Sequence, residues 1–303
     1  MPAFGRELKF GIFDHLEFRD LPLNELYEQR LQLLEYADQA GFFCYHKAEH
    51  HFSPLDAAPS ANVFLAAASQ RTRHIRLGSL VYLLPFYEPL RLIEEICCLD
   101  QLCNGRLEVG VGKGISPAEH TLWGRDAATA RQRFEEVFEI LRLGLSESSL
   151  SYQGERYQYD QVTIPHRPLQ RPQPGIWYPG NFEYAARHRL STIVGGPPAL
   201  VAGSVQKYQQ ALAKAEFDWN PGVEQPTIGA TCHIYVARDR ATALQQVSTS
   251  WPAYHRNLSY LFRQYDVAFA GGDPSLGGDT ELALKVNALV AGSPEESQSI
   301  LKA

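Results

Sequence analysis

The segment from Gly41 to Phe52 ends in Glu49-His50-His51, three adjacent side chains that could carry acid and base chemistry. The segment follows a helical stretch and has the aromatic and mixed residues of a short strand. In an α/β barrel, the carboxyl ends of parallel strands face the mouth of the active site. Alternation along a strand sends His50 to one face and Glu49 with His51 to the other. We therefore expect the two histidines to have different roles.

The chemistry expected of such a histidine is hydrogen-bond donation or proton transfer near neutral pH. A polar strand end whose histidines are simply hydrogen-bonded in place is the alternative. No metal site is expected, because consecutive strand residues point apart and the His-Glu-x-x-His spacing is absent.

A glycine-rich segment, Gly110-Val-Gly-Lys-Gly114, comes at the end of another apolar stretch. It is not a dinucleotide fingerprint, since Ile115 stands where a third glycine or alanine would be needed, and no Walker lysine-serine pair follows. Small residues needed for packing explain the segment as well as a ligand does. Without further context, Lys113 is expected to be a solvated surface charge, and Arg131 is expected to form salt bridges on the surface of a helix.

Strands and helices alternate along the chain, which predicts a parallel sheet closed into a TIM (β/α)8 barrel. A hairpin at 151–164, before the fifth strand, is expected to be an insertion. We interpret 1–303 as a single barrel domain. The expected strands are 9–13, 41–52, 75–84, 107–114, 175–178, 191–194 and 227–236, and the expected helices are 23–40, 59–69, 89–104, 127–145 and 204–217. Residues 285–292 are either an eighth strand or a segment that precedes a missing unit.

Composition narrows the class of partner. The net charge of -6 and the absence of a basic run argue against nucleic acid and membrane surfaces, and no apolar segment approaches the roughly 20 residues that span a bilayer. Five cysteines are an odd number without a Cys-x-x-Cys pair, which indicates reduced thiols. We expect a cytoplasmic protein that acts on a small organic molecule.

These segments together resemble the bacterial luciferase-like flavin-dependent monooxygenases over nearly the whole chain. The resemblance implies a TIM barrel that binds reduced FMN, uses O2 and oxygenates an organic substrate, with a separate reductase supplying the flavin. The matching segments are 10–13, 49–52, 78–85, 99–101, 105–107, 110–114, 123–124, 178–181, 185–186 and 292–296.

Site residues follow from the resemblance. It makes His50 the catalytic histidine beside the flavin, with Glu49 among the residues of the cofactor site. Leu80-Val81 falls where relatives have a non-proline cis peptide against the flavin ring. Phosphate contacts are expected from Lys113, Arg131 and the loop Gly180-Asn181. Lys113 replaces an arginine of luciferase, which keeps the charge but loses the bidentate fork.

The resemblance also implies a homodimer in which His51 meets Glu94 across the interface. Tyr82, Phe86 and Trp123 are weaker candidates for the wall of a substrate pocket, since aromatic side chains at such positions are often core. The chain is expected to lack the last βα unit of the barrel. The glycine-rich loop 270–279 is either a mobile lid or plain disorder.

Two other functions stay open. The same superfamily includes oxidoreductases that use the deazaflavin F420, and the chain could also be a flavin-binding protein without catalytic activity. Titration with both cofactors distinguishes the first alternative, and turnover measurements distinguish the second.

Overall fold

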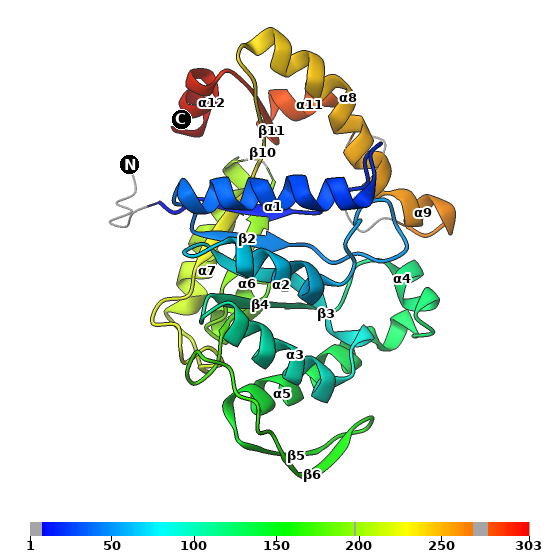
Figure 1. Cartoon of the computed structure of the whole chain (residues 1–303), viewed down its shortest axis with the longest axis vertical. Coiled ribbons are helices and arrows are strands. Elements are labelled where there is room, and N and C mark those ends of the chain that lie inside the picture. The colour runs from blue at the N-terminus through cyan, green and yellow to red at the C-terminus, as the bar shows by residue number, and fades with distance from the viewer. Residues whose placement is uncertain (1–7, 197, 269–277, 303) are drawn as a thin grey trace.

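A central parallel sheet organises the molecule, as the computed structural model of residues 8–196, 198–268 and 278–302 shows (Figure 1). Its strand order is β1-β2-β3-β4-β7, and helices α1, α2, α3 and α5 cover its outer face. The bounds are β1 Gly11–Asp14, α1 Leu23–Gln39, β2 Cys44–Lys47, α2 Ala61–Arg71, β3 Arg76–Leu83, α3 Pro89–Leu102, β4 Leu107–Gly112, α5 Ala130–Ser146 and β7 Gly175–Trp177.

The remaining strands continue the alternation in two parallel pairs, β8 with β9 and β10 with β11. A bridge between Trp177 and Ser191 links β7 to the start of β8. Among the described residues, no ladder joins β11 back to β1, so the predicted closure of the barrel is not shown. The bounds are α6 Phe182–Arg187, β8 Thr192–Gly195, α7 Pro198–Leu212, β9 Ile228–Thr231, β10 His233–Val236, α8 Arg240–Leu258, α9 Tyr260–Gln264, α11 Thr280–Lys285, β11 Leu289–Gly292 and α12 Pro294–Lys302.

Several expectations need adjustment. The predicted strand 227–236 is interrupted at Cys232, and the helix expected at 204–217 begins earlier, as α7. Helices α8 and α9 were not predicted. Two short helices, α4 (Pro117–Leu122) and η2 (Ala127–Thr129), precede α5, and η1 (Leu84–Phe86) follows β3. The antiparallel hairpin before β7 comprises β5 (Ser149–Gln153) and β6 (Gln158–Thr163). The glycine-rich segment 270–279 lies mostly outside the described residues.

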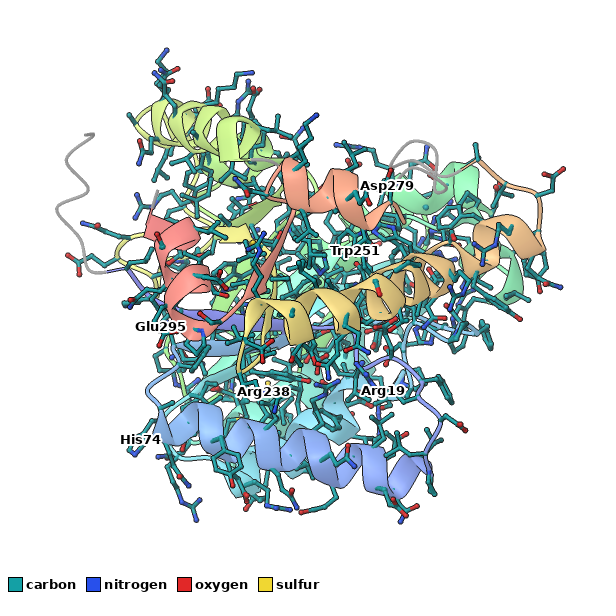
Figure 2. All side chains as sticks on the ribbon, turned by 90° about the horizontal axis from the view of Figure 1, so that it is seen from above. Arg19, His74, Arg238, Trp251, Asp279 and Glu295 are labelled. Atoms are coloured by element: carbon teal, nitrogen blue, oxygen red, sulfur yellow. The ribbon has the colours of Figure 1, made fainter. Side chains whose placement is uncertain are left out.

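A second, smaller core lies where α8 packs on β11 and α11. Trp251 of α8 is its largest side chain, and Figure 2 shows this residue on the helix that runs across the sheet. None of the helices in the described ranges combines the length and the apolar character that crossing a membrane requires.

Strand β3 contains a bulge that matters for the site. Ser79 pairs with Val109 and Tyr82 with Val111, so Leu80 and Val81 together oppose the single residue Gly110. The peptide bond between Leu80 and Val81 is cis, as expected from the resemblance. After the bulge, the side chains of β3 have exchanged faces.

Gly110 is expected to be essential for this bulge. A Cβ atom there would lie 2.4 Å from the carbonyl oxygen of Ser79 and 2.7 Å from Leu80 Cδ1. We expect Gly110→Ala to destabilise the protein by about 1–3 kcal/mol, measured by urea unfolding, because the strands must move apart. Gly203→Ala is the matched control, since a Cβ on this helical glycine meets nothing within 4 Å. That change should be neutral or stabilising by up to about 1 kcal/mol. An equal loss in both variants would contradict the argument.

Candidate active site

The loop after β2 carries Glu49-His50-His51 and is held by a buried ion pair. Lys47 and Asp56 are both fully buried, and the Lys47 ammonium donates to both carboxylate oxygens at 2.8 and 2.7 Å. Asp56 also accepts the backbone N–H of His50 at 3.1 Å. The pair therefore fixes the backbone of the loop at His50. Sequence reasoning missed both residues, because nothing in the local pattern marks a lysine and an aspartate nine positions apart as partners.

Glu49 and His50 lie on opposite sides of this loop, as strand alternation predicts. Glu49 is buried, with Oε1 3.0 Å from His51 Nε2 and Oε2 accepting from the Tyr87 hydroxyl at 2.7 Å. Both carboxylate oxygens are thus used inside the protein. In the structure Glu49 is the partner of His51 and Tyr87, and the expectation that it belongs to the cofactor site stays a prediction.

His50 faces the other side, toward a cavity about the size of a water molecule. Its Nδ1 lies 3.4 Å from Glu119 Oε1, and its ring stacks on that of His15 with centroids 5.7 Å apart. Among the described residues, no side chain binds His50 Nε2. The walls of the cavity are mostly apolar and come from the loops after β2 and β4 and from α8 and α9: Ser53, Leu55, Ile115, Ser116, Leu258, Leu261 and Phe262.

His15 follows β1 and extends this group of rings. Burial, together with the nearby His50, His233 and Lys47, lowers the pKa of His15 to about 3. The ring is therefore neutral at ordinary pH and can accept a hydrogen bond. Tyr254 of α8 packs on it, with centroids 5.5 Å apart. His15 and Tyr254 were not predicted, because α8 was not recognised and no motif marks His15.

Helix α8 is tied to the same loops by polar contacts. Asn257 donates to Glu17 at 2.9 Å, and the Ser53 hydroxyl donates to the Asn257 carbonyl at 3.5 Å. The last turn of α8 thus covers the ends of β1 and β2 and shields the space beside His50 from solvent.

The predicted phosphate contacts lie on the surface. Lys113 is exposed, and its ammonium donates to the neighbouring Gly114 carbonyl at 3.3 Å. Arg131 is 67% exposed and pairs with Glu135 at 2.8 Å, as on an ordinary helix surface. Asn181 caps α6 by accepting the Tyr184 N–H, and Gly180 precedes it. Within the described ranges, no hydrogen bond or ion pair joins these residues to His50.

Of the aromatic candidates, Tyr82 is wrongly assigned to a pocket. Its side chain is fully buried, its hydroxyl donates to Asn62 of α2 at 2.5 Å, and its ring packs against Tyr87. The β3 bulge is the reason: without it, alternation would place Tyr82 on the inner face. Phe86 and Trp123 stack on each other and gather around His51, away from the cavity that His50 lines.

His51 is expected to contact Glu94 across a dimer interface. Within the chain, His51 already has Glu49 as its partner, and Glu94 is exposed on α3. The contact between His51 and Glu94 of the partner subunit stays a prediction.

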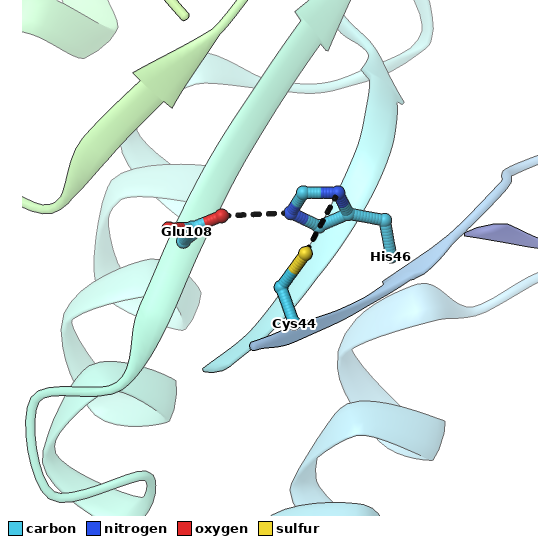
Figure 3. A group of neighbouring side chains, drawn as sticks. All are labelled: Cys44, His46 and Glu108. Carbon is cyan, nitrogen blue, oxygen red and sulfur yellow. Dashed lines mark hydrogen bonds and ion pairs between the residues drawn. The ribbon is translucent and has the colours of Figure 1, made fainter. Parts of the chain in front are cut away.

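A second polar cluster lies on the inner face of the sheet, near the amino-terminal ends of the strands (Figure 3). His46 Nε2 is 2.8 Å from Glu108 Oε2, and its Nδ1 is 4.0 Å from Cys44 Sγ. One ligand atom from each of Cys44, His46 and Glu108 lies within 4.8 Å of the others. Arg76 donates to Glu108 Oε1 at 2.7 Å, so the cluster is a network of paired charges.

The charges of this network follow from its geometry. Burial acts to lower the pKa of His46, but the contacts with Cys44 and Glu108 outweigh it and raise that pKa to about 10. Burial acts to raise the pKa of Glu108, and His46 and Arg76 together bring it below its ordinary value. Polar layers at the amino-terminal side of a barrel indicate a role in stability.

The chain is similar in sequence to known proteins. The uncharacterized protein y4wF of Sinorhizobium fredii is 35% identical over 291 residues, covering 95% of this chain and 83% of that protein. The oxygenase component of a flavin-dependent trigonelline monooxygenase of Acinetobacter baylyi is 29% identical over 242 residues, covering 76% of this chain and 65% of that protein.

Solved structures share the fold. The monooxygenase RslO1 of Streptomyces bottropensis superposes with a TM-score of 0.83 at 27% identity, over 97% of this chain and 88% of that one. Two structures at 18% identity, with TM-scores of 0.79 and 0.70, contain FMN and an F420 adduct, respectively. The sequence model of the luciferase-like monooxygenases matches residues 8–298, and with this match the chain belongs to that family.

Proposed function

We propose that the protein is a flavin-dependent monooxygenase that uses reduced FMN and O2 to oxygenate a small organic molecule. The observation that carries the proposal is the setting of His50. Its backbone is fixed by Asp56, its Nδ1 lies 3.4 Å from Glu119 Oε1, and its Nε2 has no protein partner among the described residues. A ring held in this way is free to act on a bound molecule through one nitrogen.

The residues present fit a flavin. The β3 bulge places the Leu80–Val81 peptide at the carboxyl end of a central strand, and two cationic side chains, Lys113 and Arg131, have charge to offer a phosphate group. Lys113 has no carboxylate partner in the described ranges, and the exposed pair of Arg131 with Glu135 is weak enough to be exchanged. Gly180 and Asn181 at the start of α6 complete the proposed cofactor residues.

Reduced flavin, when bound, supplies the electrons with which O2 is activated. The chain supplies the rest. With a proton on Nδ1, His50 accepts a hydrogen bond or a proton at Nε2 from a reacting molecule, and it donates from Nε2 only when the ring is doubly protonated. Helix α8 and the apolar cavity wall limit the access of water. The name of the trigonelline enzyme, an oxygenase component, supports a separate reductase as the source of reduced flavin.

The decisive experiment measures turnover with chemically reduced FMN, O2 and a panel of aldehydes, ketones, sulfonates and aromatic nitrogen compounds. Incorporation of labelled oxygen from O2 into one product is the expected result. Tight FMN binding without oxygenation of any compound would favour a flavin-binding protein without catalytic activity. An F420-dependent oxidoreductase is the remaining candidate, and tight F420 binding with no affinity for FMN would overturn the FMN proposal.

Lys113 and Arg131 are tested by comparing FMN with riboflavin, which lacks the phosphate. If each side chain contacts the phosphate, Lys113→Met and Arg131→Met should each weaken FMN binding by about tenfold or more, the expected value of a charge-assisted hydrogen bond. Riboflavin binding should change by less than about twofold, within the range of an ordinary surface substitution. Fluorescence titration measures both. Equal weakening for the two ligands would place the phosphate elsewhere.

A further inference from the structure

Glu119 forms only one half of a capping box at the start of α4. Ser116 caps α4 by accepting the Glu119 N–H at 3.3 Å, which is one half of a capping box. In the other half, the glutamate side chain normally returns to the backbone N–H of the capping residue. Here the carboxylate instead reaches the loop after β2, where Oε1 accepts the His51 N–H at 2.8 Å and lies 3.4 Å from His50 Nδ1.

The other carboxylate oxygen of Glu119 has a different setting, and Glu119 lines the same cavity as His50. Glu119 is only 1% exposed, and among the described residues its Oε2 has no hydrogen-bond donor. Glu49, across the same loop, has partners for both oxygens. Burying an oxygen without a partner costs free energy, about 1–3 kcal/mol for an ordinary polar group. A carboxylate with only a loop-anchoring role would be expected to avoid this cost, as Glu49 does.

His50 lies between two groups. On one side the Glu119 carboxylate is close to Nδ1, and on the other the His15 ring stacks at an interplanar angle of 21°. The hydrogen bond that one ring nitrogen makes sets the protonation of the other. A carboxylate at Nδ1 favours a proton on Nδ1, and this leaves Nε2 to interact with bound molecules.

We propose that Glu119 is a positioning residue for His50: it fixes the proton on Nδ1 and the orientation of the ring, so that Nε2 is presented to the reacting molecules. The placement of the ring stands on its own, whereas the effect on turnover rests on the proposed oxygenase function. Glu119 thereby joins His50 in the site although its position is almost 70 residues away in the chain.

The test is nitrogen-15 NMR of the imidazole rings in flavin-free protein, at a pH where His50 is neutral. The resonance of His50 is assigned with His50→Gln. In the wild type we expect the proton on Nδ1. In Glu119→Gln, whose amide oxygen can still accept the His51 N–H, the ratio of Nδ1–H to Nε2–H forms should fall by about tenfold or more. Glu119→Met, which has no carboxylate or amide oxygen, should show at least the same change.

Glu49→Gln is the matched control, because it alters an equally buried glutamate that contacts the other histidine. It should change the signals of His51 and leave the His50 ratio unaltered. A His50 proton on Nε2 in the wild type, or an unchanged ratio in both Glu119 variants, would overturn the proposal.

Measurements of turnover test the role of Glu119 separately from the proposed oxygenase function. With an oxygenated substrate in hand, Glu119→Gln should lower kcat by about tenfold while KM and FMN affinity change by less than about twofold, since the carboxylate charge 3.4 Å from His50 Nδ1 is lost. An unchanged kcat would overturn the role of Glu119 in the reaction. The NMR result without any oxygenation would instead leave the placement of His50 intact and refute the proposed function.

Discussion

His50→Asn is expected to lower the rate of oxygenation by about 100- to 10,000-fold, the usual contribution of a positioned general acid or base. Asparagine places an amide near the position of Nδ1, so it can still donate toward Glu119, but it removes the outer nitrogen Nε2. The loop should stay in place, because Asp56 holds the backbone N–H at this position. Affinity for FMN should therefore change little while kcat falls.

The control for His50 is its neighbour. His51→Asn removes the contact with Glu49 and disturbs the aromatic group around Phe86 and Trp123, but it leaves the His50 ring and its cavity intact. Its effect on kcat should be at least tenfold smaller than that of His50→Asn. Rapid-mixing measurements with reduced FMN distinguish the two variants. A His50→Asn variant that keeps more than about a tenth of the wild-type rate would remove His50 from the chemistry.

Glu108→Gln should cause the largest loss of stability, about 3–5 kcal/mol, because it breaks a buried ion pair by removing one partner. His46 would keep its burial and lose its counter-charge, and Arg76 would lose its carboxylate. Glu135→Gln breaks an exposed pair with Arg131 and should cost less than about 0.5 kcal/mol. Urea unfolding at pH 6 compares them, and similar losses would contradict the paired-charge interpretation.

The stabilisation by this pair should depend on pH in a stated direction. The pKa of His46 is raised from 6.5 to about 10 in the folded state, so its contribution is complete below pH 6.5 and is lost as the pH rises toward 10. The pKa of Glu108 is lowered, so its contribution is lost as the pH falls below its ordinary value of 4.5. The stability difference between wild type and Glu108→Gln should therefore be greatest between pH 4.5 and 6.5 and decrease toward pH 10. A difference that stays constant over this range would contradict the assignment.

Sequence reasoning succeeded where the signal is local. Apolar runs bounded by Gly41 or by Asn104-Gly105 located strands and helices, and strand alternation correctly separated His50 from Glu49 and His51. It failed at Tyr82. A bulge in which two residues of β3 oppose Gly110 moves the side chains after it to the opposite face of the strand. The alternation of apolar residues in the sequence does not reveal such a bulge.

Sequence reasoning did not identify the residues that contact the site residues. Glu119 and Tyr254 come from segments distant in the chain, and only the folded arrangement brings them to the loop after β2. One local signal went unused: Ser116-Pro-Ala-Glu119 has the residue types of a capping box, which marks the start of a helix. What it could not predict is the departure of the carboxylate toward His50.

The Lys47–Asp56 pair limits which substitutions these two positions can accept during evolution. A single replacement at either position leaves a lone charge in the interior and should be rejected, whereas joint replacement by apolar residues of similar volume can leave stability intact. Such a double variant would still lack the acceptor for the His50 amide. Descendants in which both positions change together would therefore keep the fold while the loop at His50 loses the hydrogen bond that holds it.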